Sequence, residues 1–228
     1  MLRADLHTHT HFSPDGVTDP AAFVRRCVAA GLTAVAVTDH NTVAGAYAVA
    51  AIAPFRVIIG EEVRARGGEL IGLFLQEPVP AGLSLQETAD RIHRQGGLVV
   101  APHPFDPLRP NLSKRGLRSL GSAVDIVEGY NGRMLLRRCD RTARAFAAAH
   151  SLPVSLGSDA HCGPELGRSY LELPDFEGPR DLPAALRHAT YHPAPRAPWL
   201  LPLSGWALAR WALGSRPRAV QRTESLRP

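Results

Sequence analysis

The sequence predicts a single α/β barrel of about seven strand–helix units. Short apolar runs alternate with helical patterns over residues 1–190, which favours a parallel sheet with helices outside it. The runs are continuously apolar, as expected of strands covered on both faces. Five of them end in His, Asp or Glu, and barrel active sites lie at the carboxyl ends of strands. The 228 residues, 45% of them hydrophobic, suffice for one such domain.

The first half of the chain carries clear start and stop signals. Asp19 and the following proline form an N-cap pattern, and Gly31 ends that helix. Asn41 or Thr42 caps the next helix, and Ser84 with the glutamate three residues later forms a capping box. Two glycines at 67–68 mark a turn after which a strand pairs back. We predict strands over 4–10, 32–38, 56–60 and 70–75, and helices over 20–30, 42–53 and 85–96.

The second half continues the alternation and then changes. We predict strands over 98–101, 124–128, 152–156 and 169–173, and helices over 114–120, 134–150 and 180–188. A tail rich in Pro, Trp and Arg follows, so we divide the chain into a barrel over 1–190 and a tail over 191–228. The run WALARWAL at 206–213 is either a short helix packed on the barrel or an interfacial helix for peripheral membrane contact.

Composition indicates the cellular compartment and the charge of possible binding partners. The net charge of +5 (26 basic and 21 acidic residues) suits an anionic substrate, but genome composition explains an Arg-rich bias equally well. Cys27, Cys139 and Cys162 show no paired spacing, which indicates a reducing compartment. The first strand begins near Met1 and no run of about 18 apolar residues occurs, so we expect no signal peptide, no membrane span and a cytoplasmic protein.

Histidines and carboxylates follow the predicted strands. His7 and His9 point to the same strand face and form a ready metal-binding pair. Four further strand ends carry TDH at 38–40, GEE at 60–62, PHP at 102–104 and GSDAH at 157–161. Buried polar groups in such number need partners, so the sequence predicts a multinuclear metal centre. Asp39 and Glu61 lie on the opposite strand faces from their neighbours, so we expect Asp39 to orient ligands or cap a helix and Glu61 to face away.

These motifs, in the order DLHTHTHFSPDG, TDH, GEE, APHP and GSDAH over residues 5–161, resemble the PHP family, the polymerase and histidinol phosphatase domains. Residues 167–179 are similar to an extension found on many stand-alone members. The resemblance implies a distorted seven-stranded TIM-like (β/α) barrel and metal-dependent phosphoesterase activity. It also implies up to three divalent ions, of zinc, manganese or iron, which the mixed donors suit.

The resemblance assigns ligands to each ion. His7, His9 and Asp159 would bind the first, Glu62 would bridge the first and second, and His103 would bind the second. The third would be held by Asp15, His40 and His161. Glu69 stands where many relatives have a histidine. It either completes the second site or is a turn residue facing water.

We therefore expect hydrolysis of a small phosphomonoester, such as a nucleotide, sugar phosphate or amino-alcohol phosphate, by attack of a metal-bridging hydroxide. Asp159, Glu62 and His161 are the predicted catalytic residues. Asn131, Arg133 and Arg168 are predicted substrate contacts, with a solvated or helix-start role as the alternative for the arginines.

Two other functions stay open. A nuclease acting on DNA or RNA ends would use the same metals, although no nucleic-acid module and no basic stripe interleaved with aromatics is visible. A non-catalytic domain held at a membrane by the Trp-rich tail is the third possibility, and the complete ligand set argues against it.

Overall fold

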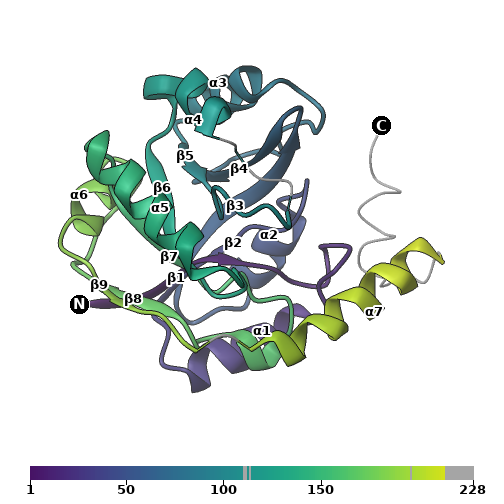
Figure 1. Ribbon diagram of the computed structural model, residues 1–228. Helices are drawn as coiled ribbons and strands as arrows, with labels where there is room; N and C mark the ends of the chain where they lie inside the picture. Colours follow the sequence, from purple (N-terminus) through teal and green to yellow (C-terminus); the bar gives the residue numbers. More distant parts are fainter. Residues whose placement is uncertain (110–111, 113, 196, 214–228) are drawn as a thin grey trace.

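A computed structural model describes residues 1–109, 112, 114–195 and 197–213 (Figure 1). Its described strands form one sheet in the order β7-β6-β5-β4-β3-β2-β1-β8-β9. Their bounds are β1 Leu2–Thr8, β2 Ala34–Val37, β3 Arg56–Ala65, β4 Gly68–Leu73, β5 Leu98–Ala101, β6 Ile126–Asn131, β7 Val154–Gly157, β8 Tyr170–Leu173 and β9 Thr190–His192.

The sheet curls until its seventh strand meets its first. The Asp159 amide, just after β7, donates to the His7 carbonyl (2.8 Å), and the His9 amide donates to the Ala160 carbonyl (2.9 Å). β8 pairs antiparallel with β1 along the edge that faces away from β2, and β9 pairs antiparallel with β8. The result is a nearly closed, barrel-like α/β sheet, which confirms the predicted fold class.

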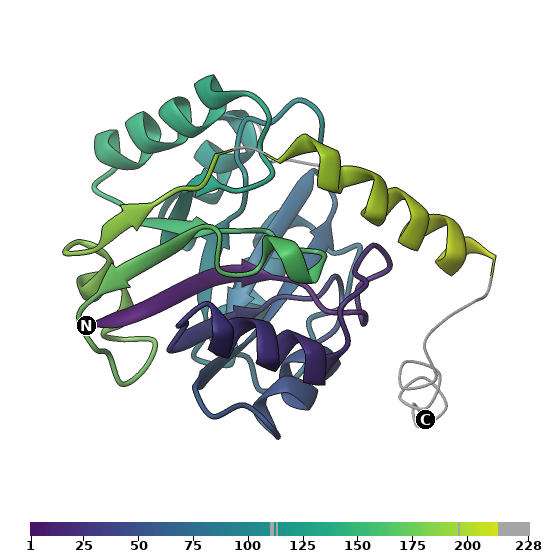
Figure 2. The same cartoon turned by 90° about the horizontal axis from the view of Figure 1, so that it is seen from below.

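The helices lie outside this curved sheet (Figures 1 and 2). They are α1 Pro20–Ala29, α2 Ala44–Ala50, α3 Leu85–Arg94, α4 Lys114–Leu120, α5 Arg137–Ala149, α6 Leu182–Leu186 and α7 Leu201–Ala212, with 3-10 turns η1 Gly121–Ala123, η2 Gly163–Glu165 and η3 Pro198–Leu200. The Asp19 cap of α1 and the Ser84–Glu87 capping box of α3 are both present. Within the described residues, every helix is too short or too polar to cross a lipid bilayer.

Several predicted boundaries were wrong. The short strand β9 was not predicted. The β3 strand continues past Gly60 because its second half pairs with the hairpin partner β4. The α2 helix begins at Ala44, and its N-cap residue Val43 makes no capping bond, but Thr42 Oγ1 accepts from the Ala44 amide (3.2 Å). The Asn41 side-chain oxygen instead accepts from the Arg64 amide (2.8 Å). The tail helix α7 begins at Leu201, five residues earlier than predicted.

Three apolar clusters hold the barrel together. One cluster contains a residue from each of the first seven strands, so it fills the barrel interior: Leu6, Ala36, Ile58, Ile71, Val100, Ile126 and Leu156. The other two clusters join outward strand residues to the surrounding helices. This packing fixes the positions of the strand ends, and with them the polar groups that follow each strand.

Candidate metal centre

The predicted ligands converge at the carboxyl ends of the strands. The Nε2 atoms of His7 and His9 lie 3.0 Å apart. Glu62 Oε2 lies 3.2 Å from the first of these nitrogens and 3.3 Å from the second. Asp159 Oδ1 lies 3.6 and 3.4 Å from the same two atoms. Four side chains, from β1 and the residue after Thr8, from β3 and from the β7 end, therefore surround one point. They are the three predicted ligands of the first ion and Glu62, the predicted bridge to the second.

Glu62 stands at the middle of the whole cluster. Its Oε1 lies 2.8 Å from His103 Nε2, and its Oε2 lies 3.3 Å from His40 Nδ1. Glu69 joins from β4, where it is buried, and its Oε2 lies 3.9 Å from His103 Nε2. Glu62, Glu69 and His103 form one group that could hold a metal ion. Of the two predicted roles of Glu69, the geometry therefore favours that of a ligand at the second site over that of a turn residue facing water.

The third predicted set also comes together. Asp15 Oδ2 lies 2.9 Å from His161 Nε2 and 3.6 Å from His40 Nε2. The rings of His9 and His161 stack with centroids 4.1 Å apart, and the potential ligand atoms of His9, His40 and His161 form a further group. His9 thus lies between the first and third candidate sites.

The outer partners of the histidines show that the cluster fits a metal. The Nδ1 atoms of His7, His9 and His161 each face an acceptor outside the centre: Glu128 Oε1 (2.9 Å), Ser13 Oγ (2.9 Å) and the Asp159 carbonyl (2.8 Å). An imidazole that donates through Nδ1 turns the lone pair of Nε2 inward. Lone pairs of two imidazoles 3.0 Å apart repel each other unless a cation lies between them. Divalent metal ions suit this donor set of imidazole and carboxylate.

The electrostatics of the cluster favour positive charge. Burial alone would lower the pKa of His7, but Asp159, Glu128 and Glu62 outweigh it and raise that pKa well above its ordinary value. In the same way, Glu62 and Asp15 raise the pKa of His40 to about 10. Carboxylates that stabilise a protonated imidazole also stabilise a metal cation in its place.

Two candidate ligands adopt unusual backbone conformations. His103 has φ = 27° and Asp159 has φ = 55°, in the left-handed region that side chains with a Cβ seldom occupy. Such positions cost on the order of 1–3 kcal/mol each and concentrate at functional sites. The barrel therefore holds both side chains in place at a local energetic cost.

Comparisons with known proteins agree with this geometry. Residues 5–99 match the PHP domain model, and residues 140–191 match the PHP-associated model. The chain is 39% identical over 143 residues to the protein MJ1587 of Methanocaldococcus jannaschii, covering 57% of this chain and 82% of that protein. The chain belongs to the PHP domain family.

Solved structures share the fold of this PHP domain. A two-domain protein from Bacteroides vulgatus that contains a predicted PHP-like metal-dependent phosphoesterase aligns with a TM-score of 0.70 at 19% identity, over 85% of this chain and 65% of that one. The lesion-specific endonuclease EndoQ of Pyrococcus furiosus aligns with a TM-score of 0.63 at 18% identity, over 83% and 57%. At these identities the likeness concerns the fold.

A second layer of polar side chains orients the centre of this PHP domain. Asp39 Oδ1 accepts from the Thr10 amide (2.7 Å) and from Ser13 Oγ (2.8 Å), whose oxygen in turn faces His9. Asp39 therefore acts on the ligands indirectly, as expected. Glu61 Oε2 accepts from the Val79 amide (2.7 Å), on the side of β3 opposite Glu62.

Sequence reasoning gave no role to Glu128, which contacts two candidate ligands and Asn131. Besides facing His7, it accepts from the His103 amide (2.6 Å) and from Asn131 Nδ2 (2.9 Å). Asn131, a predicted substrate contact, is buried and also donates to Asp159 Oδ2 (3.2 Å). An acidic residue inside the apolar run of β6 was the available signal, because a buried carboxylate needs partners.

We expect Glu128→Gln to lower metal affinity by about 10- to 100-fold, since it removes the charge that orients His7 and polarises its ring. Titration of metal-free protein with zinc or manganese, followed by calorimetry, measures this change. Glu172→Gln, on the exposed side of β8, is the control and should leave affinity unchanged. Equal affinities for the wild type and Glu128→Gln would contradict the orienting role.

Sequence reasoning also missed Arg109. Its Nη1 pairs with Asp159 Oδ2, and its Nε lies 3.7 Å from Asp106 Oδ2. Burial alone would raise the pKa of Asp159, but Arg109 and His7 outweigh it and hold that pKa well below its usual range. Arg109 lies in the irregular segment after β5, where no periodic pattern indicates the direction of a side chain. Only the fold brings it to the centre.

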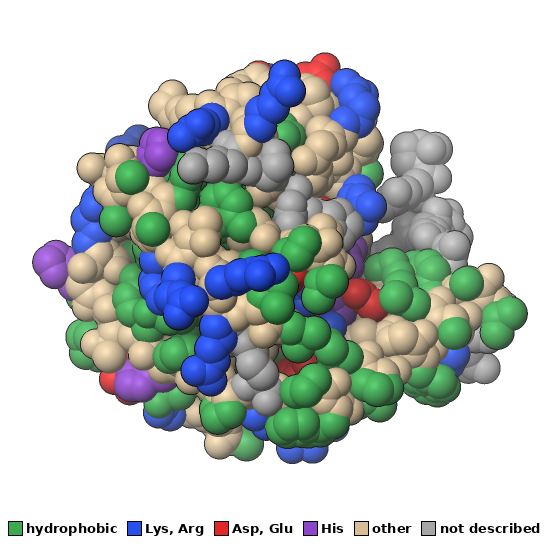
Figure 3. Space-filling model, viewed as in Figure 1, with side chains coloured by type: hydrophobic (Ala, Val, Ile, Leu, Met, Phe, Trp, Pro, Cys, Tyr) green, Lys and Arg blue, Asp and Glu red, His purple; other side chains and the backbone are tan. Residues whose placement is uncertain are grey.

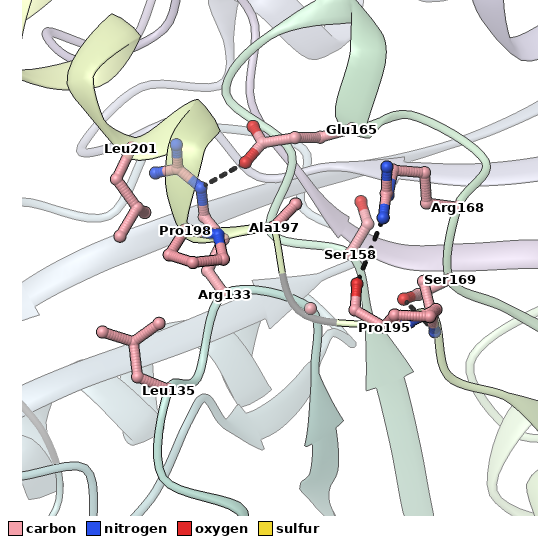
Figure 4. A pocket seen from close by; sticks show the side chains of 12 residues that line it. Arg133, Leu135, Ser158, Glu165, Arg168, Ser169, Pro195, Ala197, Pro198 and Leu201 are labelled. Carbon is pink, nitrogen blue, oxygen red and sulfur yellow. Dashed lines mark hydrogen bonds and ion pairs between the residues drawn. The ribbon is translucent and has the colours of Figure 1, made fainter.

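The two arginines that were predicted to contact substrate, Arg133 and Arg168, contact the tail (Figure 4). Arg133 Nε donates to Glu165 Oε1 (2.8 Å), and its Nη2 donates to Ser204 Oγ in α7 (2.7 Å). Arg168 Nη2 donates to the Pro195 carbonyl (3.1 Å). Arg133 lines the pocket that the candidate metal ligands also line, whereas Arg168 lines a smaller neighbouring pocket. Their role toward substrate stays a prediction.

Proposed function

We propose that this PHP-type phosphoesterase is a phosphatase that hydrolyses a small phosphomonoester with up to three divalent ions of zinc, manganese or iron. The observation that carries the proposal is that three groups of His and carboxylate side chains meet at one pocket of about 500 Å³, and that each group contributes residues to its lining. A volume of this size suits a small organic ligand. Arginines at its border suit an anionic one: Arg64, Arg109 and Arg133.

The ligand assignment follows the geometry. His7, His9 and Asp159 would hold the first ion, with Glu62 shared between it and the second. The second would also be held by His103 and Glu69, and the third by Asp15, His40 and His161. When bound, such ions lower the pKa of water and neutralise charge on the phosphoryl oxygens.

The chain's own groups would then orient the reaction. Asp159 Oδ2 is fixed by Arg109 and Asn131, which turns Oδ1 toward His7 and His9. Asp159 would steer the proton of the attacking water, Glu62 would be the ligand shared by two ions, and His161 would help to hold the third ion.

Arg109 is our candidate for the phosphate contact, because a guanidinium binds phosphate oxygens in pairs. We expect Arg109→Ala to raise KM for the ester about 10- to 100-fold at saturating metal, from the loss of a charge-assisted contact. Arg91→Ala, on the exposed face of α3, is the control. Steady-state kinetics with the metal content measured separates this effect from loss of metal. An unchanged KM in the fully loaded variant would exclude the contact.

A nuclease acting on DNA or RNA ends is the second candidate. EndoQ of Pyrococcus furiosus, which shares the fold, is an endonuclease. Arg137, Arg141 and Arg144 of α5 border a hollow of about 420 Å³ beside Tyr130. Basic side chains gather over α5 in Figure 3. Arginines beside an aromatic ring suit a polynucleotide backbone, which supports this candidate.

One experiment separates the two. Purified, metal-quantified protein is tested on nucleoside mono- and bisphosphates, histidinol phosphate, sugar phosphates, and short DNA and RNA. Phosphate release from a small ester with two to three metal ions per chain supports the phosphatase. Shortened oligonucleotides without ester turnover, with a steep dependence on salt, would move the assignment to the nuclease.

A further inference from the structure

Helix α7 forms one wall of the pocket that holds the candidate metal ligands. It lies at the end of the barrel to which the β1 arrow points (Figure 2). Its Leu201 and Leu208, two helical turns apart, line the same pocket as His40 and Glu62. Hydrophobic side chains gather along α7 in the space-filling view (Figure 3). The tail of this chain therefore contributes to the site rather than trailing from it.

The α7 helix is fastened to the metal-binding loops. Ser204 receives a hydrogen bond from Arg133, which also donates to Glu165. Glu165 Oε2 in turn accepts from the His161 amide (2.8 Å). A second fastening precedes the helix, where the Ala194 amide donates to Ser169 Oγ (3.0 Å). These contacts hold the wall at a fixed place relative to a candidate ligand (Figure 4).

The wall differs in chemistry from the rest of the pocket. Apart from Leu201, Leu208 and Pro14, all of the described lining residues are polar or charged. Leu208 is 49% exposed, although a leucine side chain gains free energy when it leaves water. Small-molecule sites combine apolar surface with a few fixed polar groups. In this pocket the polar groups lie on the strand ends and the apolar surface lies on α7.

We propose that Leu201 and Leu208 form an apolar subsite for the leaving group, so that the preferred substrates are phosphomonoesters with an apolar or aromatic leaving group. The inference rests on the proposed phosphatase function and narrows its substrate class. The phosphate is held over the strand ends, and the organic part contacts α7. An ester of a small polyol has no apolar group to contact Leu201 and Leu208, so its binding is not strengthened by α7.

The test compares two esters in two variants. Phosphate release from phenyl phosphate and from glycerol 2-phosphate is measured for the metal-loaded wild type, Leu208→Ala and Leu203→Ala. Leu203 is 40% exposed on the same helix and does not line the pocket, so it is the matched control. We expect Leu208→Ala to raise KM for phenyl phosphate about 5- to 20-fold, with kcat and both glycerol 2-phosphate constants within about twofold of wild type. Leu203→Ala should match the wild type.

A binding measurement keeps the inference separate from the proposed function. Calorimetry of the loaded protein with phenylphosphonate and with methylphosphonate needs no turnover. Tighter binding of phenylphosphonate in the wild type, lost in Leu208→Ala and kept in Leu203→Ala, supports the subsite even when neither ester is hydrolysed. Absence of ester hydrolysis would count against the phosphatase function but not against the subsite. Equal binding of the two phosphonates, or equal effects of Leu208→Ala on both esters, would overturn the subsite.

Discussion

Replacing Glu62 by alanine is expected to abolish turnover and to remove bound metal. The Glu62 carboxylate lies within 3.3 Å of imidazole nitrogens of His7, His9, His40 and His103. The surrounding imidazoles outweigh burial and hold the pKa of this carboxyl well below its ordinary value, so the group is ionised at neutral pH. Its removal leaves facing imidazoles without a shared counter-charge, and it deletes the only side chain assigned to two ions.

We expect kcat to fall by on the order of 10³-fold or more, because two ions lose a common ligand and the charge they would stabilise is left uncompensated. Glu62→Gln keeps the shape but not the charge and should show a similar loss. The measurements are metal per chain by mass spectrometry after dialysis, and turnover of the best ester.

Glu61→Gln is the matched control for this experiment. It changes the adjacent buried carboxylate on the opposite face of β3, and the amide oxygen can still accept from the Val79 backbone. We expect near-normal metal content and turnover. A folded Glu62→Ala protein with full metal and normal turnover would exclude the proposed centre.

Removal of metal by a chelator should eliminate activity while leaving the barrel folded. The candidate ligands lie beyond the strand ends, whereas three apolar clusters hold the strands and helices below them. The far-ultraviolet circular dichroism spectrum should therefore stay unchanged, unlike that of a small domain whose folding depends on zinc. Addition of zinc, manganese or iron to the chelated protein should restore turnover and identify the ion that supports it.

Restoration should depend on pH in a defined direction. In the metal-free protein the pKa of His40 is raised to about 10, so its ring is protonated at neutral pH and must lose a proton to bind an ion. Lower pH therefore weakens metal binding, and less activity should return at pH 6 than at pH 8. Full activity in the chelated protein, or loss of the folded spectrum, would contradict this account.

Much of the candidate centre could be read from the sequence. His7 and His9 share a face because strand side chains alternate, and the same spacing of two relates Asp159 to His161. The order of strands and helices predicted that their polar ends would meet at one end of a barrel. The alternation of side chains along a strand determines the first feature, and the order of strands and helices determines the second. Neither prediction requires knowledge of how the side chains pack.

Other features depended on contacts between distant segments. Arg109 is 50 residues from its partner Asp159, and it follows β5 in an irregular segment. Glu128 is 121 residues from His7 and 25 from His103. The sequence marks such residues only as polar, and it does not say which of several neighbouring loops their side chains reach.

The sequence by itself predicted the barrel, because periodicity and spacing act over a few residues. The resemblance of its ordered motifs to the PHP family supplied the family and the set of candidate histidines and carboxylates. The tertiary structure decided which groups orient these ligands and what lines the pocket above them. It turned Glu69 inward on β4, engaged Arg133 with Ser204, and laid Leu208 of the tail beside the metal groups. Each of these outcomes depends on how distant segments pack, and no local pattern in the chain records that packing.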